Sequence, residues 1–192
     1  MIALPAQPDL TPEEYLEFER HSDIKHEYID GETYAMAGTN KAHNIISLNL
    51  ALSLRQILRG SSCQVFMADI KVSIDNQRHF FYPDLIVTCD DNQDLNAYIV
   101  EFPKLIIEVL SDSTETFDRG KKFHYYRAIP SLQEYVLVST QEYLVEIFRR
   151  TTNNLWLLQT YETLKTLVVL ESLAVSLPLA DIYATLELPD PS

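Results

Sequence analysis

Glycine is scarce in this sequence, with four residues in 192. Loops that cradle phosphate groups depend on glycine, and the chain contains no P-loop, GxGxxG or GxSxG motif. Its five histidines form no HExxH pattern. These absences exclude the commonest nucleotide-binding and hydrolase signatures, so any catalytic site must be built from other residues.

Cysteine is equally sparse, with Cys63 and Cys89 as the two examples. They do not indicate a disulfide framework or a CxxC metal site, so a reduced, cytoplasmic setting is expected. No apolar run approaches the roughly 18 residues of a membrane span. The N-terminus has neither the basic nor the apolar region of a signal peptide. We therefore expect a protein with no membrane partner.

Basic residues are few beside acidic ones, since 15 Lys and Arg oppose 28 Asp and Glu for a net charge of −13. Nucleic-acid binding needs a surplus of Lys and Arg to neutralise phosphates, so this balance argues against a generic nucleic-acid binder. The segment from Asp118 to Arg127 runs against the trend, with four basic residues and His124 beside one Asp. A local basic surface is therefore available, and a homodimer could gather two of them.

The length and the 46% hydrophobic content fit a single domain over residues 1–192. Thr11-Pro12-Glu13-Glu14 predicts a capped helix, and Asp30-Gly31 between β-prone runs predicts a hairpin over 26–36. Apolar periodicity predicts a helix over 42–58 and a short closing helix over 178–186. The basic segment described above is expected to form a further helix that ends at Ala128. The expected strands are 64–67, 69–75, 80–88, 105–110, 134–138, 144–148, 154–161 and 167–170. This order predicts an α/β (α+β) fold, with a mixed β-sheet flanked by helices after an N-terminal helix and β-hairpin.

Two acids interrupt apolar strands: Asp84 lies within Phe80–Thr88, and Glu108 lies within Leu105–Leu110. An unpaired buried carboxylate costs several kcal/mol, so a cation should meet each of them. A shared divalent cation would offset that cost for both acids at once, and oxygen ligands suit Mg²⁺ or Mn²⁺. The alternative is that each acid lies at a strand end or pairs with a Lys or Arg.

Adjacent lysines follow on the basic helix, and Lys121 and Lys122 point about 100° apart. Lys122 forms an i,i+4 pair with Tyr126, so it is the better candidate to face the acids and to stabilise charge on a phosphate. A solvated lysine is the alternative. Glu32, which follows the hairpin turn, and His43, which begins the second helix, are possible supporting residues, although either could be an ordinary polar residue near the end of an element.

Pro83-Asp84, followed by Glu108 in an apolar strand, resembles the PD-(D/E)XK restriction-endonuclease-like superfamily. The fuller pattern is similar to that of the "putative restriction endonuclease" family, once catalogued as a domain of unknown function. That pattern consists of Tyr82-Pro83-Asp84-Leu85, Leu105–Ser111, Asp118–Phe123 and Ile129-Pro130-Ser131-Leu132, and the resemblance covers most of the chain.

The resemblance implies a restriction-endonuclease-like core with a central mixed sheet, Mg²⁺ held by Asp84 and Glu108, and hydrolysis of DNA phosphodiester bonds. One feature departs from the superfamily motif, because Val109-Leu110 replaces the usual strand lysine. In this branch the lysine has moved to the following helix, where Lys122 fits better than Lys121.

Three functions follow from these residues. The first is a Mg²⁺-dependent DNA endonuclease with Asp84, Glu108 and Lys122 as its catalytic residues. The second, suggested by the net charge of −13 and the missing strand lysine, is a non-catalytic binding or assembly protein on the same fold. The third is a metal-dependent phosphodiesterase that acts on RNA or nucleotides. Titration with Mn²⁺ separates the second from the other two, and a panel of substrates separates the first from the third.

Overall fold

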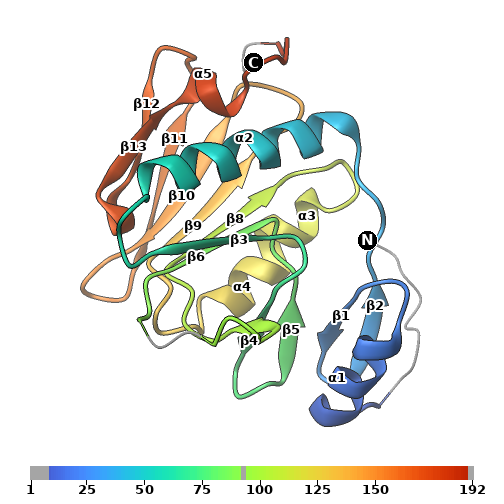
Figure 1. Ribbon diagram of the computed structural model, residues 1–192. Coiled ribbons are helices and arrows are strands. Elements are labelled where there is room, and N and C mark those ends of the chain that lie inside the picture. The colour runs from blue at the N-terminus through green and yellow to red at the C-terminus, as the bar shows by residue number, and fades with distance from the viewer. Residues whose placement is uncertain (1–8, 92–93, 190–192) are drawn as a thin grey trace.

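The largest of the three β-sheets in the described residues has six strands in the order β11-β10-β9-β8-β6-β3 (Figure 1). The structure is a computed structural model that describes residues 9–91 and 94–189. The six strands are β3 (Gln64–Met67), β6 (Leu85–Thr88), β8 (Leu105–Val109), β9 (Glu134–Val138), β10 (Val145–Arg150) and β11 (Trp156–Tyr161).

The second sheet has five short strands in the order β2-β1-β5-β4-β7, and β12 and β13 form a separate pair. These strands are β1 (His26–Ile29), β2 (Glu32–Ala35), β4 (Lys71–Ile74), β5 (His79–Phe81), β7 (Ile99–Val100), β12 (Leu167–Leu170) and β13 (Val175–Pro178). The helical segments are α1 (Pro12–His21), α2 (Lys41–Ile57), α3 (Glu115–Phe117), the π-helix η1 (Asp118–Lys122), α4 (Phe123–Tyr126), the 3₁₀ turn η2 (Glu171–Leu173) and α5 (Leu179–Ile182).

The six-stranded sheet is mixed, as the sequence predicts. Strands β8 and β9 are parallel, and the other neighbouring pairs are antiparallel. A parallel pair needs a crossover connection, and the chain between β8 and β9 makes it through α3, η1 and α4. The crossover therefore lies over one face of the sheet, directly after the strand that carries Glu108.

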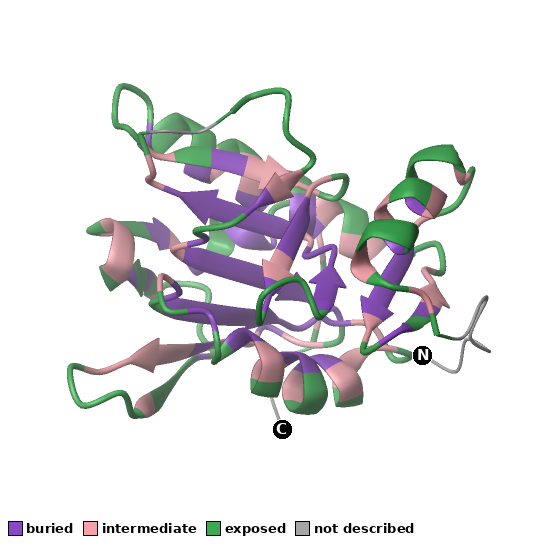
Figure 2. Ribbon diagram, turned by 90° about the horizontal axis from the view of Figure 1, so that it is seen from below, coloured by how far each residue is buried: buried purple, intermediate pink, exposed green. Residues whose placement is uncertain are grey.

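Helices cover both faces of this sheet, with α2 on one side and α4 on the other (Figure 1). Leu50 of α2 shares a core cluster with Ile107 of β8. Tyr126 of α4 shares the opposite cluster with Ile106. Because successive side chains of a strand alternate between faces, Glu108 projects toward the α4 side. Figure 2 shows the resulting burial, with the central strands buried and exposed residues on loops, on the outer sides of helices and on the outer strand β11.

The N-terminal elements confirm two predictions made from short motifs. The Thr11 hydroxyl accepts a hydrogen bond from the backbone N–H of Glu14, and the Glu14 carboxylate accepts one from the N–H of Thr11. This is the expected capping box of α1. Asp30 (φ 47°) and Gly31 (φ 98°) both have positive φ, which a two-residue type I′ hairpin between β1 and β2 requires.

The predicted strand over 80–88 is wrong, because it is two strands in two different sheets. Strand β5 ends at Phe81 in the five-stranded sheet, and β6 begins at Leu85 in the six-stranded sheet. Pro83 has no N–H to donate to a ladder, so the pairing breaks there and the chain changes sheets. Asp84 therefore lies in the connection just before β6. The closing helix is also shorter than predicted, since β13 extends to Pro178 and α5 ends at Ile182.

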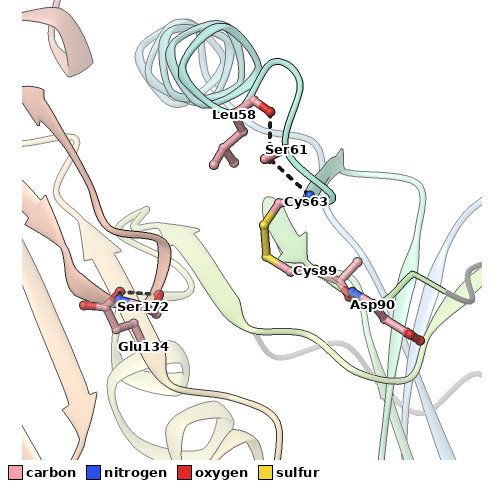
Figure 3. Close-up of a disulfide and its surroundings, with 8 residues drawn as sticks. Leu58, Ser61, Cys63, Cys89, Asp90, Glu134 and Ser172 are labelled. Atoms are coloured by element: carbon pink, nitrogen blue, oxygen red, sulfur yellow. Dashed lines mark hydrogen bonds between the residues drawn. A yellow bond between two sulfur atoms is a disulfide. The ribbon is translucent and has the colours of Figure 1, made fainter.

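The expectation of two reduced cysteines is also wrong, because Cys63 and Cys89 form a disulfide (Figure 3). Strand β3 pairs with β6 in a register that places Gln64 opposite Thr88, so the two cysteines are the next cross-strand pair along. Their proximity depends on this pairing and not on a spacing motif, which is why the sequence did not indicate it. Across the described ranges, no helix has the length and hydrophobicity that crossing a bilayer requires.

Candidate active site

Asp84 and Glu108 converge at the point where β6 begins beside β8. Leu85 faces Ile107 across this antiparallel pair, so continuing the register by one residue places Asp84 opposite Glu108 on the same face. The backbone N–H of Asp84 donates to Glu108 Oε2 at 3.3 Å. The N–H of Val109 donates to Asp84 Oδ2 at 2.7 Å. Each carboxylate therefore accepts a hydrogen bond from a backbone N–H at or next to the other acid.

Lys122 reaches this pair of acids from the crossover segment. Its Nζ lies 3.0 Å from Glu108 Oε1, 3.0 Å from Glu27 Oε1 and 3.3 Å from Asp118 Oδ1. The hydroxyl of Tyr126 also donates to Glu108 Oε1, at 2.9 Å. One buried ammonium group is thus surrounded by three buried carboxylates.

The π-helix η1 places Lys122 and Asp118 inward together. These residues are the two ends of the π-helical segment, and both are buried, whereas Gly120 and Lys121 between them are exposed. A π-turn contains an extra residue relative to an α-turn, and such turns occur frequently at functional sites. The sequence indicates a helix here, but not its π geometry.

Two of the predicted supporting residues lie outside this cluster. Lys121 is exposed and makes none of the described contacts with the acids. Glu32 is also exposed, and its carboxylate accepts a hydrogen bond from the hydroxyl of Tyr34. Of the two adjacent lysines, Lys122 is therefore the one that lies beside the acids.

His43 does contact the acids. It lies in the first turn of α2, where its backbone N–H donates to the Asn40 side chain that caps the helix. Its Nε2 lies 3.1 Å from Asp84 Oδ2. Within the described part of the chain its buried Nδ1 has no hydrogen-bond partner. The ring of His43 thus contacts Asp84 from α2, whereas Lys122 contacts Glu108 from the crossover segment.

Glu27 and Asp118 were missed as site residues, although each carries a signal. Glu27 is fully buried on β1 between His26 and Tyr28, so it is another acid in a strand where an apolar residue is expected. Asp118 precedes Lys122 by four residues, which is the spacing of a helical ion pair.

The cluster contains more acidic than basic side chains, and burial shifts their pKa values. Burial raises the pKa of Glu108 well above its usual value, and the negative charges of Asp118 and Asp84 add to this effect, whereas the Lys122 ammonium opposes it. Burial likewise raises the pKa of Glu27, against the same ammonium. Burial alone would lower the pKa of Lys122, but Glu108 and Glu27 raise it well above its usual value. Lys122 is therefore a firmly charged ammonium among an excess of acids.

Several oxygens of the cluster have spare bonding capacity. Glu27 Oε1 and Asp118 Oδ1 both lie beside the Lys122 ammonium, at 3.0 and 3.3 Å, so these acids share one cation with Glu108. The donor set of Asp84, Glu108, Glu27 and Asp118 consists entirely of carboxylate oxygens, which hard cations prefer. The described side chains nevertheless contain no preformed group of three or more potential metal ligands.

A model of the family described as "Putative restriction endonuclease", Uma2, matches residues 12–180. This chain belongs to the Uma2 family. Uma2 relatives include two uncharacterised proteins of Synechocystis sp. PCC 6803. One of them, slr1290, is 38% identical over 92% of this chain and 92% of its own length. The other, sll1609, is 35% identical over 82% of this chain and 90% of its own length.

A solved structure supports the same fold. It is described as a putative nuclease belonging to DUF820 from Anabaena variabilis, and it superposes with a TM-score of 0.75. The match covers 91% of this chain and 98% of that one at 19% identity, so it establishes the fold alone. The Uma2 chain therefore has the restriction-endonuclease-like architecture that its motifs indicate.

Proposed function

We propose that this Uma2 protein is an endonuclease that hydrolyses DNA phosphodiester bonds with the help of a divalent metal ion. The observation that carries the proposal is the convergence of Asp84 and Glu108 across the β6–β8 pair, with the Lys122 ammonium 3.0 Å from Glu108. An acid–acid–lysine arrangement of this kind suits phosphodiester hydrolysis, because the reaction requires a cation, an oriented water and a stabilised phosphate charge.

Asp84 and Glu108 would hold Mg²⁺ or Mn²⁺. The fit rests on the donor chemistry, since both residues offer carboxylate oxygens and the cluster of four acids has one resident lysine. Two protein carboxylates suffice for Mg²⁺, which usually retains several waters and takes phosphate oxygens as further ligands. When bound, such a metal neutralises charge on the scissile phosphate and lowers the pKa of a coordinated water.

Asp84 defines the side from which substrate would approach. Its side chain is 23% exposed, compared with 4% for Glu108 and 5% for Lys122. The Val109 N–H and the His43 ring both contact Oδ2 of Asp84, which fixes the orientation of the carboxylate. The scissile phosphate would therefore meet Asp84 first, with Glu108 and Lys122 beneath it.

Lys122 would supply a fixed positive charge to the reaction. Glu27 and Asp118 would act as positioning residues, because they hold its ammonium beside Glu108. From this position Lys122 can donate to a non-bridging phosphate oxygen or hold the attacking water. Its charge is present from the start, so it need not be acquired during the reaction.

The proposal is tested by cleavage of supercoiled plasmid DNA with Mg²⁺ or Mn²⁺. We expect Asp84→Asn and Glu108→Gln to lower the cleavage rate at least about a hundredfold, because metal catalysis contributes several kcal/mol and 1.4 kcal/mol is a factor of ten. Glu32→Gln and Lys121→Met serve as matched controls, since they alter an exposed acid and an exposed lysine outside the cluster. Both controls should cleave at the wild-type rate.

A phosphodiesterase that acts on RNA or nucleotides is the second candidate, and the net charge of −13 favours it, because a small substrate needs fewer phosphate contacts. RNA and bis(p-nitrophenyl) phosphate therefore belong in the same assay. Cleavage of RNA or bis(p-nitrophenyl) phosphate, but not of plasmid DNA, would show that the protein is a phosphodiesterase with a substrate other than DNA. Equal rates for wild type, Asp84→Asn and Glu108→Gln, or no cleavage of any substrate with either metal, would contradict the proposal and favour a non-catalytic binding protein.

A further inference from the structure

Strand β11 forms one outer edge of the six-stranded sheet, and no strand of the described chain pairs with its outer side. Its inner side pairs with β10 over six residues, from Arg150↔Trp156 to Val145↔Tyr161. Four of its six residues, from Leu157 to Thr160, are exposed. This edge is longer than the opposite edge, where β3 has four residues.

The direction of the free backbone groups follows from the neighbouring hydrogen bonds. The N–H of Arg150 donates toward the β9 side of β10, and the N–H of Thr151 donates to Leu155 on the β11 side. Because the backbone groups of alternate residues point to opposite sides of a strand, those of Leu158 and Thr160 point away from β10. Their N–H and C=O groups form a template for another strand.

This edge lacks the features that usually protect an edge strand. Natural edges carry charged residues, proline, bulges or a covering element. The eleven residues from Thr151 to Tyr161 include no charged residue and no proline. Leu155, Leu157 and Leu158 are 64%, 61% and 53% exposed. An open, uncharged and apolar edge of this kind favours pairing with another strand.

The charge distribution indicates which partner fits. The chain carries a net charge of −13, but residues 151–170 contain one acid, Glu162, and one base, Lys165. Two copies of an acidic protein repel each other least where the contacting segments are neutral. Nucleic acid does not suit this edge, because the strand offers no cation for phosphate.

We propose that β11 is a self-association surface, on which β11 of a second copy pairs antiparallel about a twofold axis. Twofold symmetry makes the same patch contact itself, and it makes identical strands antiparallel. The outward backbone groups supply the hydrogen bonds, and the exposed leucines bury apolar area beside them. The two six-stranded sheets then continue into one another. This inference does not depend on nuclease activity.

The test is the molar mass of the full chain in solution, measured by sedimentation velocity over a range of concentrations up to about 100 μM. Wild type should form a dimer. Leu158→Lys should give a monomer, because two lysines would meet near the twofold axis. Thr160→Pro should do the same by removing an outward N–H, which an edge strand tolerates without unfolding.

Leu52→Lys is the matched control. Leu52 is 68% exposed on α2, so this variant makes the same substitution on another apolar surface. It should remain a dimer, with a circular dichroism spectrum like that of wild type. A monomeric wild type, a dimer that persists in both β11 variants, or dissociation caused by Leu52→Lys would each overturn the inference.

Discussion

Lys122 is the residue that keeps the buried acids compatible with a folded protein. Its ammonium lies within 3.3 Å of carboxylate oxygens of Glu27, Glu108 and Asp118, and all four side chains are at least nine-tenths buried. A buried carboxylate without a cation is costly, so these acids are stable together because the lysine is present. The same residue therefore has a structural and a proposed catalytic role.

Lys122→Met should lower the free energy of unfolding by about 3–5 kcal/mol, which is the usual cost of removing one partner from a buried ion pair. Urea denaturation at neutral pH measures the change. Lys121→Met is the control, because it removes an exposed lysine from the neighbouring position. A Lys122→Met variant as stable as wild type would mean that the acids are protonated or solvated without this lysine.

At the level of single residues, the sequence indicated Asp84, Glu108 and Lys122 because acids in apolar strands and a lysine on the next helix are visible in a linear pattern. Glu27 has the same pattern, but a four-residue strand beside a hairpin turn gives too short an apolar context to stand out. Glu32, the acid on the other side of that turn, was the residue singled out, and it is exposed. Only the pairing of β1 with its neighbours decides which of the two acids is buried.

Secondary-structure elements were predictable where one local motif decides the outcome. The capping box fixed the start of α1, and Asp30-Gly31 fixed the turn between β1 and β2. The break at Pro83 has a local signal, the missing N–H of proline, which the prediction of one strand over 80–88 did not take into account. The π-turn of η1 was not predictable, because it depends on packing between distant segments. These two deviations from the regular pattern place Asp84 and Lys122 at the site.

The Cys63–Cys89 disulfide is a second feature of the elements that tertiary pairing alone reveals. It joins the residue just before β3 to the residue just after β6, and the two cysteines are separated by 26 positions in the sequence. A loop of this length predicts a contribution of about 3–4 kcal/mol to the free energy of unfolding, from the lower entropy of the unfolded chain. We therefore expect reduction with dithiothreitol to lower the stability of wild type by that amount.

The measurement is denaturation with and without the reductant. A Cys63→Ala/Cys89→Ala double variant should match reduced wild type, and dithiothreitol should leave it unchanged. Equal stability of oxidised and reduced wild type would show that the bond does not constrain the unfolded chain.

In the whole molecule, the candidate site lies where the two larger sheets and the crossover segment meet. Glu27 comes from the five-stranded sheet, and Glu108 comes from the six-stranded sheet. Asp84 comes from the connection that joins the two sheets, and Lys122 from the crossover between β8 and β9. The α+β class and the mixed sheet followed from the order of elements. The position of one sheet relative to the other could not be predicted from that order, because it depends on long-range packing. That packing brings Glu27 to the lysine and leaves the cluster with four acidic side chains and one lysine.

The claim that this excess of acidic side chains serves a divalent cation is tested most directly by a crystal of the protein soaked in Mn²⁺. Anomalous scattering locates the ion without reference to activity. The account predicts a peak within coordination distance of both Asp84 and Glu108, and its loss in the Asp84→Asn variant. A crystal with no Mn²⁺ between these two carboxylates, or with Mn²⁺ bound only elsewhere on the protein, would contradict it.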